Sequence, residues 1–245
     1  LGGGTAVSNT AGSITSSVSA NTDSGFSVVS YTGTGAVGTI GHGLGQLPAM
    51  IIFKNRSSAT DWMVFHKNSQ SSYNFSATAF LTLNSTAAVN GTGVSGVMND
   101  TAPTTSLFTV GNDSRSNGSG NSMIAYCFAE VKGYSNMGSY VGNNSADGPF
   151  IYTGFKPAWV LFKRSSATEN WSLYDNKRLG YNSQAYGLRP NSSLAESAYG
   201  GGGAAGAVDF VSNGFKIREI GTNINNGTYI YMAFAENPLV GTNNI

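Results

Sequence analysis

Short runs of hydrophobic residues recur along the whole chain, separated by stretches rich in Gly, Ser, Thr and Asn. Val, Ile, Phe, Tyr and Trp predominate within the runs, and such side chains fit the pleated, half-buried surface of a sheet. No run keeps the i, i+3, i+4, i+7 spacing of an amphipathic helix over three turns. The best helical candidate, residues 192–200, offers about two turns. With dense NG, DG and SG turn signals between the runs, the pattern predicts an all-β fold of short antiparallel strands.

Two of the runs, DWMVF and NWSLY, alternate with the period of a strand. This period predicts that Trp62 and Val64 share one face of a sheet, and that Trp171 and Leu173 share the corresponding face elsewhere. The run IAYCFAE alternates differently, because Ala125, Cys127 and Ala129 form a face of small side chains. A small face permits close approach, so we expect it to pack against a neighbouring sheet, domain or chain.

The same wording occurs twice. Residues 30–54 align with residues 139–163. The first copy then reads KNR where the second reads KR, and after this one-residue difference the phrase RSSAT aligns in both copies. Further on, residues 124–130 align with 230–236. A repeat of roughly 110 residues has the size of a whole domain rather than of a solenoid unit. The sequence therefore predicts an internal duplication.

These boundaries give a domain organisation. Residues 1–25 are rich in Gly, Ser and Thr and are predicted to be a linker or an extended arm. Residues 26–133 and 134–245 are predicted to be two tandem antiparallel β-sandwich units, jelly-roll-like, because each holds several short strands separated by turns.

Composition narrows the possible functions. Only 10% of the residues are charged and the net charge is +1, against about 25% charged residues in a typical soluble protein. A broad electrostatic surface for nucleic acid or for anionic membrane is therefore not expected. No run approaches the ~20 apolar residues of a membrane span, so no membrane insertion is expected. The chain begins at Leu1 without a recognisable leader, so we expect a processed product or a piece of a longer protein.

Three motifs suggest chemistry that their context does not support. GTGAVG, residues 33–38, matches a dinucleotide fingerprint, but the Gly-rich sequence that follows cannot form the required helix. His42, His66 and the single cysteine, Cys127, lack the spacing of metal ligands. We therefore expect no cofactor and no metal, and Cys127 is interpreted as a small buried hydrophobic residue without an intrachain disulfide.

Catalysis is likewise not expected. No G-x-S-x-G elbow is present. Glu130 and Glu236 occupy equivalent places in the two copies, which favours a structural task over the paired carboxylates of a glycosidase. The sequence therefore predicts that the protein is not an enzyme.

Aromatic and polar residues around the repeated phrase are the better candidates for binding. Their rings could stack on a sugar, while neighbouring polar groups bond its hydroxyls. The alternative is that a tryptophan kept in both copies belongs to the core. The candidate ligand-binding residues are Trp62, His66, Trp171, Tyr174 and Asp175.

The segment GGGTAVSNTAGSITSSVSANTDSGFSVVSYTGTG, with IGHGLGQLP and MIIFKNRSSATDWMVFH, resembles structural proteins of tailed bacteriophages, especially those of marine bacteria and cyanobacteria. IAYCFAEVKGYSNMGSYVGNNSADGPFIYTGFKPAWVLFKR and TYIYMAFAENP extend the resemblance over nearly the whole chain. Proteins of this type are virion-surface proteins, tail-fibre-like or on the capsid, built from repeated β-rich units. The resemblance identifies no functional residue.

The resemblance implies a virion structural protein, a tail-fibre or receptor-binding module that attaches to the host surface. Alternatives are a capsid decoration or fibre-attachment protein, a host-glycan depolymerase, and a non-viral extracellular fibre subunit or adhesin. The expected location is the virion surface, outside the cell. Expected partners are further copies of the chain in a homo-oligomer, other virion proteins, and a host-surface glycan or protein.

Overall fold

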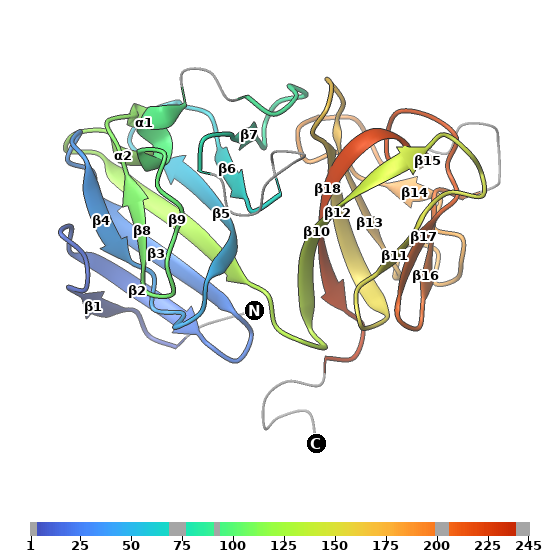
Figure 1. Cartoon of the computed structure of the whole chain (residues 1–245), viewed down its shortest axis with the longest axis horizontal. Coiled ribbons are helices and arrows are strands. Elements are labelled where there is room, and N and C mark those ends of the chain that lie inside the picture. Colours follow the sequence, from blue (N-terminus) through green and yellow to red (C-terminus); the bar gives the residue numbers. More distant parts are fainter. Residues whose placement is uncertain (1–3, 69–76, 91–93, 199–205, 239–245) are drawn as a thin grey trace. The chain divides into compact units, whose positions relative to one another are not determined.

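The protein is described by a computed structural model that covers residues 4–68, 77–90, 94–198 and 206–238. It has two compact units (Figure 1). Unit 1 comprises Leu1–Leu83 and Val89–Val131, and unit 2 comprises Asn84–Ala88 and Lys132–Ile245. Every strand pair in the described residues is antiparallel, so the all-β prediction is confirmed.

Unit 1 is a sandwich whose main sheet has the strand order β1-β2-β3-β9-β5-β6-β7. A two-stranded sheet, β4-β8, and the short helices α1 and α2 form its second layer (Figure 1). The elements are β1 Val7–Asn9, β2 Ser16–Asn21, β3 Phe26–Thr32, β4 Gly38–Gly41, β5 Pro48–Asn55, β6 Met63–His66, β7 Leu81–Thr82, α1 Ser95–Met98, β8 Leu107–Val110, α2 Ser114–Asn117 and β9 Ser122–Ala129.

The core of unit 1 lies between these layers. Phe53 of the main sheet meets Phe108 of β8 edge to face, with ring centroids 5.6 Å apart. Ala125 and Cys127 on β9 are 0% exposed in the same cluster. The alternation predicted for residues 62–65 is confirmed, because Met63 and Phe65 belong to this core cluster whereas Val64 lies on the opposite face.

Unit 2 has a four-stranded sheet, β10-β18-β12-β13, a three-stranded sheet, β11-β17-β16, and the pair β14-β15. Ile151, Phe210 and Phe215 of the three-stranded sheet share one core cluster with Phe162 and Tyr231 of the four-stranded sheet. The strands are β10 Ser135–Asn143, β11 Phe150–Tyr152, β12 Pro157–Arg164, β13 Trp171–Asp175, β14 Tyr186–Gly187, β15 Ser197–Ala198, β16 Val208–Val211, β17 Gly214–Ile217 and β18 Asn226–Ala235.

The two units share a local plan. The order β3-β9-β5-β6 in unit 1 corresponds to β10-β18-β12-β13 in unit 2. The Tyr31 hydroxyl donates to the Ser116 carbonyl over 2.5 Å, and that of Tyr140 donates to the Ile224 carbonyl over 2.6 Å. An internal duplication would leave this correspondence; the duplication itself stays a prediction.

The interpretation of residues 1–25 as a linker or an extended arm separate from the two units is wrong for the described residues 4–25. β1 and β2 pair with each other, and β2 pairs with β3, so this segment extends the main sheet of unit 1. The physical reason is a weak period of two, in which Ile14, Ser16 and Val18 point inward and are buried. The predicted boundary at 133/134 lies within two residues of the observed one, but Asn84–Ala88 groups with unit 2.

The best helical candidate of the sequence, residues 192–200, is not helical in its described part, where Ser197–Ala198 forms β15; residues 199–200 lie outside the described ranges. The small face of β9 does pack closely, as expected, but within unit 1 rather than against another chain. Ala125, Cys127 and Ala129 are each at most 1% exposed and belong to the core cluster. Burial raises the pKa of the Cys127 thiol to about 12.

Enlarging Ala125 tests this assignment. Ala125 lies between Val29 and Phe53 on the neighbouring strands, so Ala125→Met is expected to lower the free energy of unfolding by about 2 kcal/mol through overpacking. Urea denaturation measures the change, and Ser17→Met, at an exposed position of β2, is the control. A variant with unchanged stability but altered mass in solution would place this face at an interface between chains.

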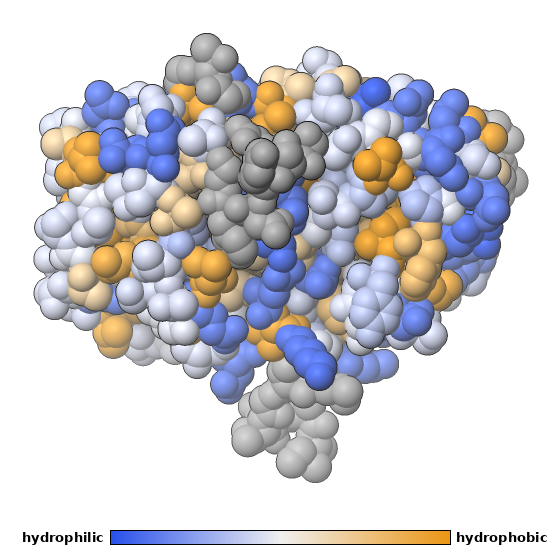
Figure 2. Space-filling model, viewed as in Figure 1, coloured by the Kyte–Doolittle hydropathy of each residue, from blue (hydrophilic) through white to orange (hydrophobic). Residues whose placement is uncertain are grey.

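Within the described ranges, large apolar side chains are exposed at scattered positions, among them Val37, Leu194 and Ile220. Figure 2 shows hydrophobic residues scattered among hydrophilic and neutral ones on the face in view. Isolated apolar side chains of this kind are normal for a protein surface. No helix of the described ranges is long and apolar enough to cross a membrane.

Candidate functional site

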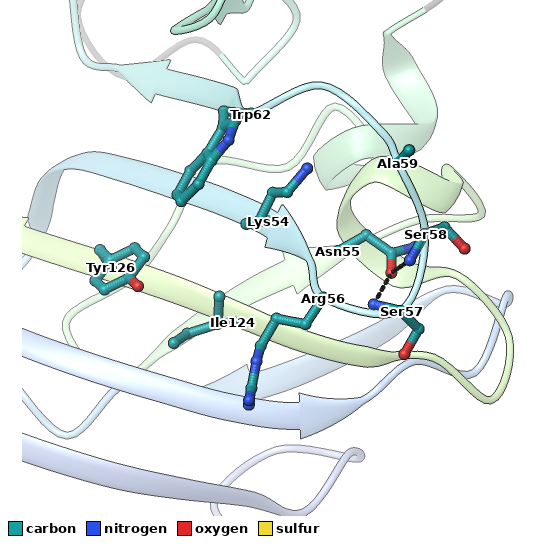
Figure 3. Close-up of a pocket in the computed structure, with 9 residues that line it drawn as sticks. All are labelled: Lys54, Asn55, Arg56, Ser57, Ser58, Ala59, Trp62, Ile124 and Tyr126. Atoms are coloured by element: carbon teal, nitrogen blue, oxygen red, sulfur yellow. Dashed lines mark hydrogen bonds between the residues drawn. The ribbon is translucent and has the colours of Figure 1, made fainter. Parts of the chain in front are cut away.

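A hollow of about 620 Å³ lies on the face of the unit 1 sheet that points away from the core (Figure 3). It is formed where β5 ends, by the loop that follows β5 and by the neighbouring strand β9. We call it the Trp62 hollow. Its lining residues are Lys54, Asn55, Arg56, Ser57, Ser58, Ala59, Trp62, Ile124 and Tyr126.

Two aromatic rings and a cation define one end of the hollow. The rings of Trp62 and Tyr126 lie nearly parallel, at 20°, with centroids 6.5 Å apart. The Lys54 ammonium lies 5.5 Å from the centre of the Trp62 ring, within the range of a cation–π interaction. The same ammonium donates to the Thr60 carbonyl. Lys54 therefore contacts both the Trp62 ring and the backbone of the loop that follows β5.

A buried asparagine fixes the loop at the other end. Asn55 is 0% exposed, and its amide donates to the Ser114 carbonyl over 2.8 Å. Its side-chain oxygen accepts from the backbone N–H groups of Ser57 and Ser58, at 2.9 and 3.1 Å (Figure 3). The Arg56 N–H donates to the Ser122 carbonyl over 2.8 Å. These hydrogen bonds fix the backbone at Arg56 and at the two residues that follow it. The Arg56 side chain is exposed and lies beside Ile124 (Figure 3).

The one-residue difference between KNR and KR explains why unit 2 lacks this arrangement. In unit 1, Asn55 pairs with Met123, whereas the corresponding position of β12 is occupied by Arg164, which pairs with Tyr229. A shift of one residue along a strand moves a side chain to the other face. The arginine of the repeated phrase therefore lies beyond the strand, beside the hollow, in unit 1 and within the strand in unit 2.

In unit 2, the lysine that corresponds to Lys54 is buried and donates hydrogen bonds to backbone carbonyls. Lys163 is 0% exposed, and its ammonium donates to the carbonyls of Thr86, at 3.2 Å, and Arg164, at 2.8 Å. The Thr86 carbonyl also accepts from the Glu169 N–H over 2.9 Å. Burial lowers the pKa of Lys163 to about 8. In unit 2 the lysine is therefore bonded to segment Asn84–Ala88, through Thr86, whereas its counterpart Lys54 lines a hollow in unit 1.

Of the five candidate residues, only Trp62 lines the Trp62 hollow. Trp171 is 1% exposed, and His66 and Tyr174 are 0% exposed. The prediction is wrong for these three because a ligand cannot reach a buried side chain. The sequence could not show that Trp62 lines a hollow whereas Trp171 is buried, because both tryptophans follow the same phrase. The difference arises from the residues that pack around each ring in the folded chain.

Asp175 is engaged at the end of β13. Its carboxylate accepts from the backbone N–H groups of Lys177 and Arg178, at 3.0 and 3.1 Å. It also pairs with the Arg178 guanidinium at 2.8 Å. Asp175 therefore stabilises a turn, and its assignment to a binding site is not supported.

Sequence reasoning missed the residues that surround Trp62. Lys54, Arg56 and Tyr126 lie on three separate segments that the fold brings together. The available signal was the additional residue in KNR, because an insertion in one copy of a repeat marks a place where the two copies differ in shape.

Other chemistry is not apparent in the described ranges. No three His, Cys, Asp or Glu side chains there lie close enough to hold a metal ion. His42 is buried: its Nε2 lies 3.1 Å from the Thr104 carbonyl, and its Nδ1 accepts from the Leu44 N–H over 3.2 Å. Burial lowers its pKa. The segment GTGAVG connects β3 to β4 and is followed by a strand, which excludes the dinucleotide-binding geometry.

Comparison with known proteins identifies a family without assigning a function. A family model described as a domain of unknown function (DUF7483) matches residues 1–238 and so extends across both units. No curated protein and no solved structure matches the chain. On the strength of the family match, the chain belongs to the DUF7483 family.

Proposed function

We propose that this chain is a structural module of a bacteriophage virion, of the tail-fibre or receptor-binding type, that attaches to a glycan on the host surface. The observation that carries the proposal is the Trp62 hollow. An aromatic pair beside exposed serines and cations is the combination that binds sugars, because rings pack on their apolar faces while polar groups bond their hydroxyls. The resemblance of the sequence to phage structural proteins supplies the biological setting.

The rest of the molecule suits this task. The exposed loop after β5 is carried by a rigid antiparallel sheet, which is the usual placement of binding residues. Few charges and many hydroxyl and amide groups make the surface polar. In this proposal the chain lies on the virion surface, contacts other virion proteins and forms a homo-oligomer. Its action is binding, with no catalytic step.

Unit 1 is the binding unit in this proposal. Its lysine, Lys54, lines an open hollow, whereas Lys163 in unit 2 is buried beneath the Thr86 carbonyl. Unit 2 is then a structural repeat whose corresponding position is closed by the chain itself.

Binding of the purified chain to envelope polysaccharides from marine bacteria and cyanobacteria tests the proposal. Trp62→Ala is expected to raise the Kd at least about tenfold, because stacking on an aromatic ring contributes ~1–3 kcal/mol. Tyr181→Ala, which removes an exposed aromatic ring from unit 2, is the matched control and should leave the Kd unchanged. Surface plasmon resonance on immobilised polysaccharide provides the measurement.

Three other outcomes would redirect the assignment. Tight binding to phage heads with no binding to envelope would support a capsid decoration or fibre-attachment protein. Shortening of the polysaccharide during incubation would support a depolymerase. Binding that Trp62→Ala does not weaken would move the site away from the Trp62 hollow.

A further inference from the structure

A second hollow adjoins the Trp62 hollow, and Arg56 lines both. This second hollow has a volume of about 300 Å³. Besides Arg56, its lining includes the hydroxyl residues Thr15, Ser30, Thr32 and Ser122. Thr15 directly precedes β2, so the N-terminal segment that joins the main sheet supplies part of this wall.

The two hollows share Arg56, and their lining residues follow one another across the strands of the main sheet. We call the two hollows together the groove. The order β2-β3-β9-β5-β6 places Thr15, beside β2, at one end and Trp62, beside β6, at the other. Arg56, directly after β5, lies between them and nearer to Trp62. Four strand-to-strand spacings of ~4.8 Å give a length of roughly 19 Å. A groove of this length accommodates a chain of sugars rather than a single ring.

The groove has one sign of charge. Lys54 and Arg56 line it, and among the described residues neither hollow is lined by Asp or Glu. Arg56 is exposed, and its planar guanidinium matches the geometry of a carboxylate with two parallel hydrogen bonds. The surrounding hydroxyl groups can bond neutral parts of a sugar.

We propose that this groove binds an acidic polysaccharide chain, with a sugar carboxylate on Arg56, a ring face on Trp62 and further hydroxyls on Thr15 and Thr32. This inference rests on the proposed function and adds the substrate class and a second subsite to it. Two cations among many hydroxyl groups favour an acidic glycan over a nucleic acid. Proteins that bind nucleic acid line their grooves with many basic residues, which contact the phosphate backbone.

Calorimetric titration of the full chain with alginate oligosaccharides tests the inference. Alginate supplies one carboxylate on every sugar, and the same oligosaccharides after carboxyl reduction are the neutral control. We expect the hexasaccharide to bind at least about tenfold more tightly than the disaccharide, and more weakly as salt rises from about 50 to 200 mM. The carboxyl-reduced hexasaccharide should bind at least about tenfold more weakly.

Three variants divide the groove. Arg56→Gln is expected to weaken hexasaccharide binding at least about tenfold and to remove most of its salt dependence. Thr32→Val, at the far subsite, should weaken the hexasaccharide and leave the disaccharide unaffected. Lys132→Gln removes an exposed charge outside both hollows and should change nothing. Circular dichroism confirms that each variant is folded.

The outcomes separate this inference from the proposed function. Equal binding of native and carboxyl-reduced chains, abolished by Trp62→Ala, would overturn the acidic class and leave the glycan-binding function intact. Binding to envelope polysaccharide without binding to alginate would also overturn it. Displacement of the alginate hexasaccharide by single-stranded DNA of equal affinity would show that the groove binds polyanions in general, and would overturn the assignment to an acidic glycan. Absence of binding to every polysaccharide, envelope included, would remove both proposals.

Discussion

Replacing Asn117 with alanine is expected to lower the free energy of unfolding of unit 1 by about 4 kcal/mol. Asn117 is 0% exposed at the end of α2. Its amide donates to the carbonyls of Gly111, at 2.6 Å, and Ala36, at 2.7 Å, and its oxygen accepts from the Thr34 N–H at 2.8 Å. Alanine would leave these backbone groups without their partner, and each buried unpaired group costs ~1–3 kcal/mol.

Urea denaturation followed by hydrogen exchange of β3 and β9 reports the stability of unit 1. Asn112→Ala, which truncates an exposed asparagine in the loop before α2, is the matched control and should change the free energy of unfolding by less than about 0.5 kcal/mol. A buried asparagine makes similar bonds in unit 2: Asn225 is 0% exposed, and its side-chain amide donates to the carbonyls of Glu219 and Ser145 at 2.6 and 2.7 Å. An Asn117→Ala variant as stable as its control would show that these bonds are not required.

A buried carboxyl group in unit 2 gives the second large effect. Glu219 is 1% exposed, and burial raises its pKa to about 7. The Asn223 amide donates to it over 2.6 Å, which lowers the pKa, whereas the nearby Glu169 carboxylate raises it. Arg189, whose positive charge also lowers this pKa, donates to Asn223 over 3.2 Å. Burial is the largest of these influences.

This pKa makes unit 2 less stable at high pH. The folded chain holds the proton of Glu219 more tightly than the unfolded chain, in which the pKa is near 4.5. The stabilisation is therefore complete below pH 4.5 and is lost as pH rises to about 7. Over this window the loss reaches about 3 kcal/mol at most. Glu219→Gln should remove this dependence and raise the stability at pH 8.

Urea denaturation between pH 5 and pH 8, followed by exchange in β10 and β18, provides the measurement. Glu196→Gln alters a carboxylate whose side chain is 42% exposed, so it should retain the pH dependence of the parent. Below pH 4.5 other carboxylates, whose pKa values are lowered, act in the opposite direction; they include Asp113, Glu169 and Glu236. An unchanged slope in Glu219→Gln would assign the dependence to another group.

The sequence predicted the class of fold because its signal is local. Alternation over residues 62–65 and 171–174 placed each side chain on the observed face, since a strand repeats every two residues. The boundary between units was also nearly correct. The N-terminal strands were missed because the inward positions Ser16 and Ala20 are small, and Ile14 and Val18 alone gave too weak a pattern.

The site was predicted only at Trp62. The sequence contains the same phrase twice, but exposure of its tryptophan depends on contacts between distant segments. Thr86, which bonds Lys163, lies far from that residue in the sequence. The second hollow depends on Thr15 and Thr32, which β2–β3 pairing brings to one wall. Such contacts follow from topology, and the hydrophobic pattern carries no information about them.

The additional residue in KNR suggests how a repeated module acquires a new role. One additional residue at Asn55 places the arginine beyond the end of the strand in unit 1, whereas Arg164 lies within the strand in unit 2, and both units keep the same strand order. Under the predicted duplication and the proposed function, selection can act on glycan recognition in unit 1 and on stability alone in unit 2.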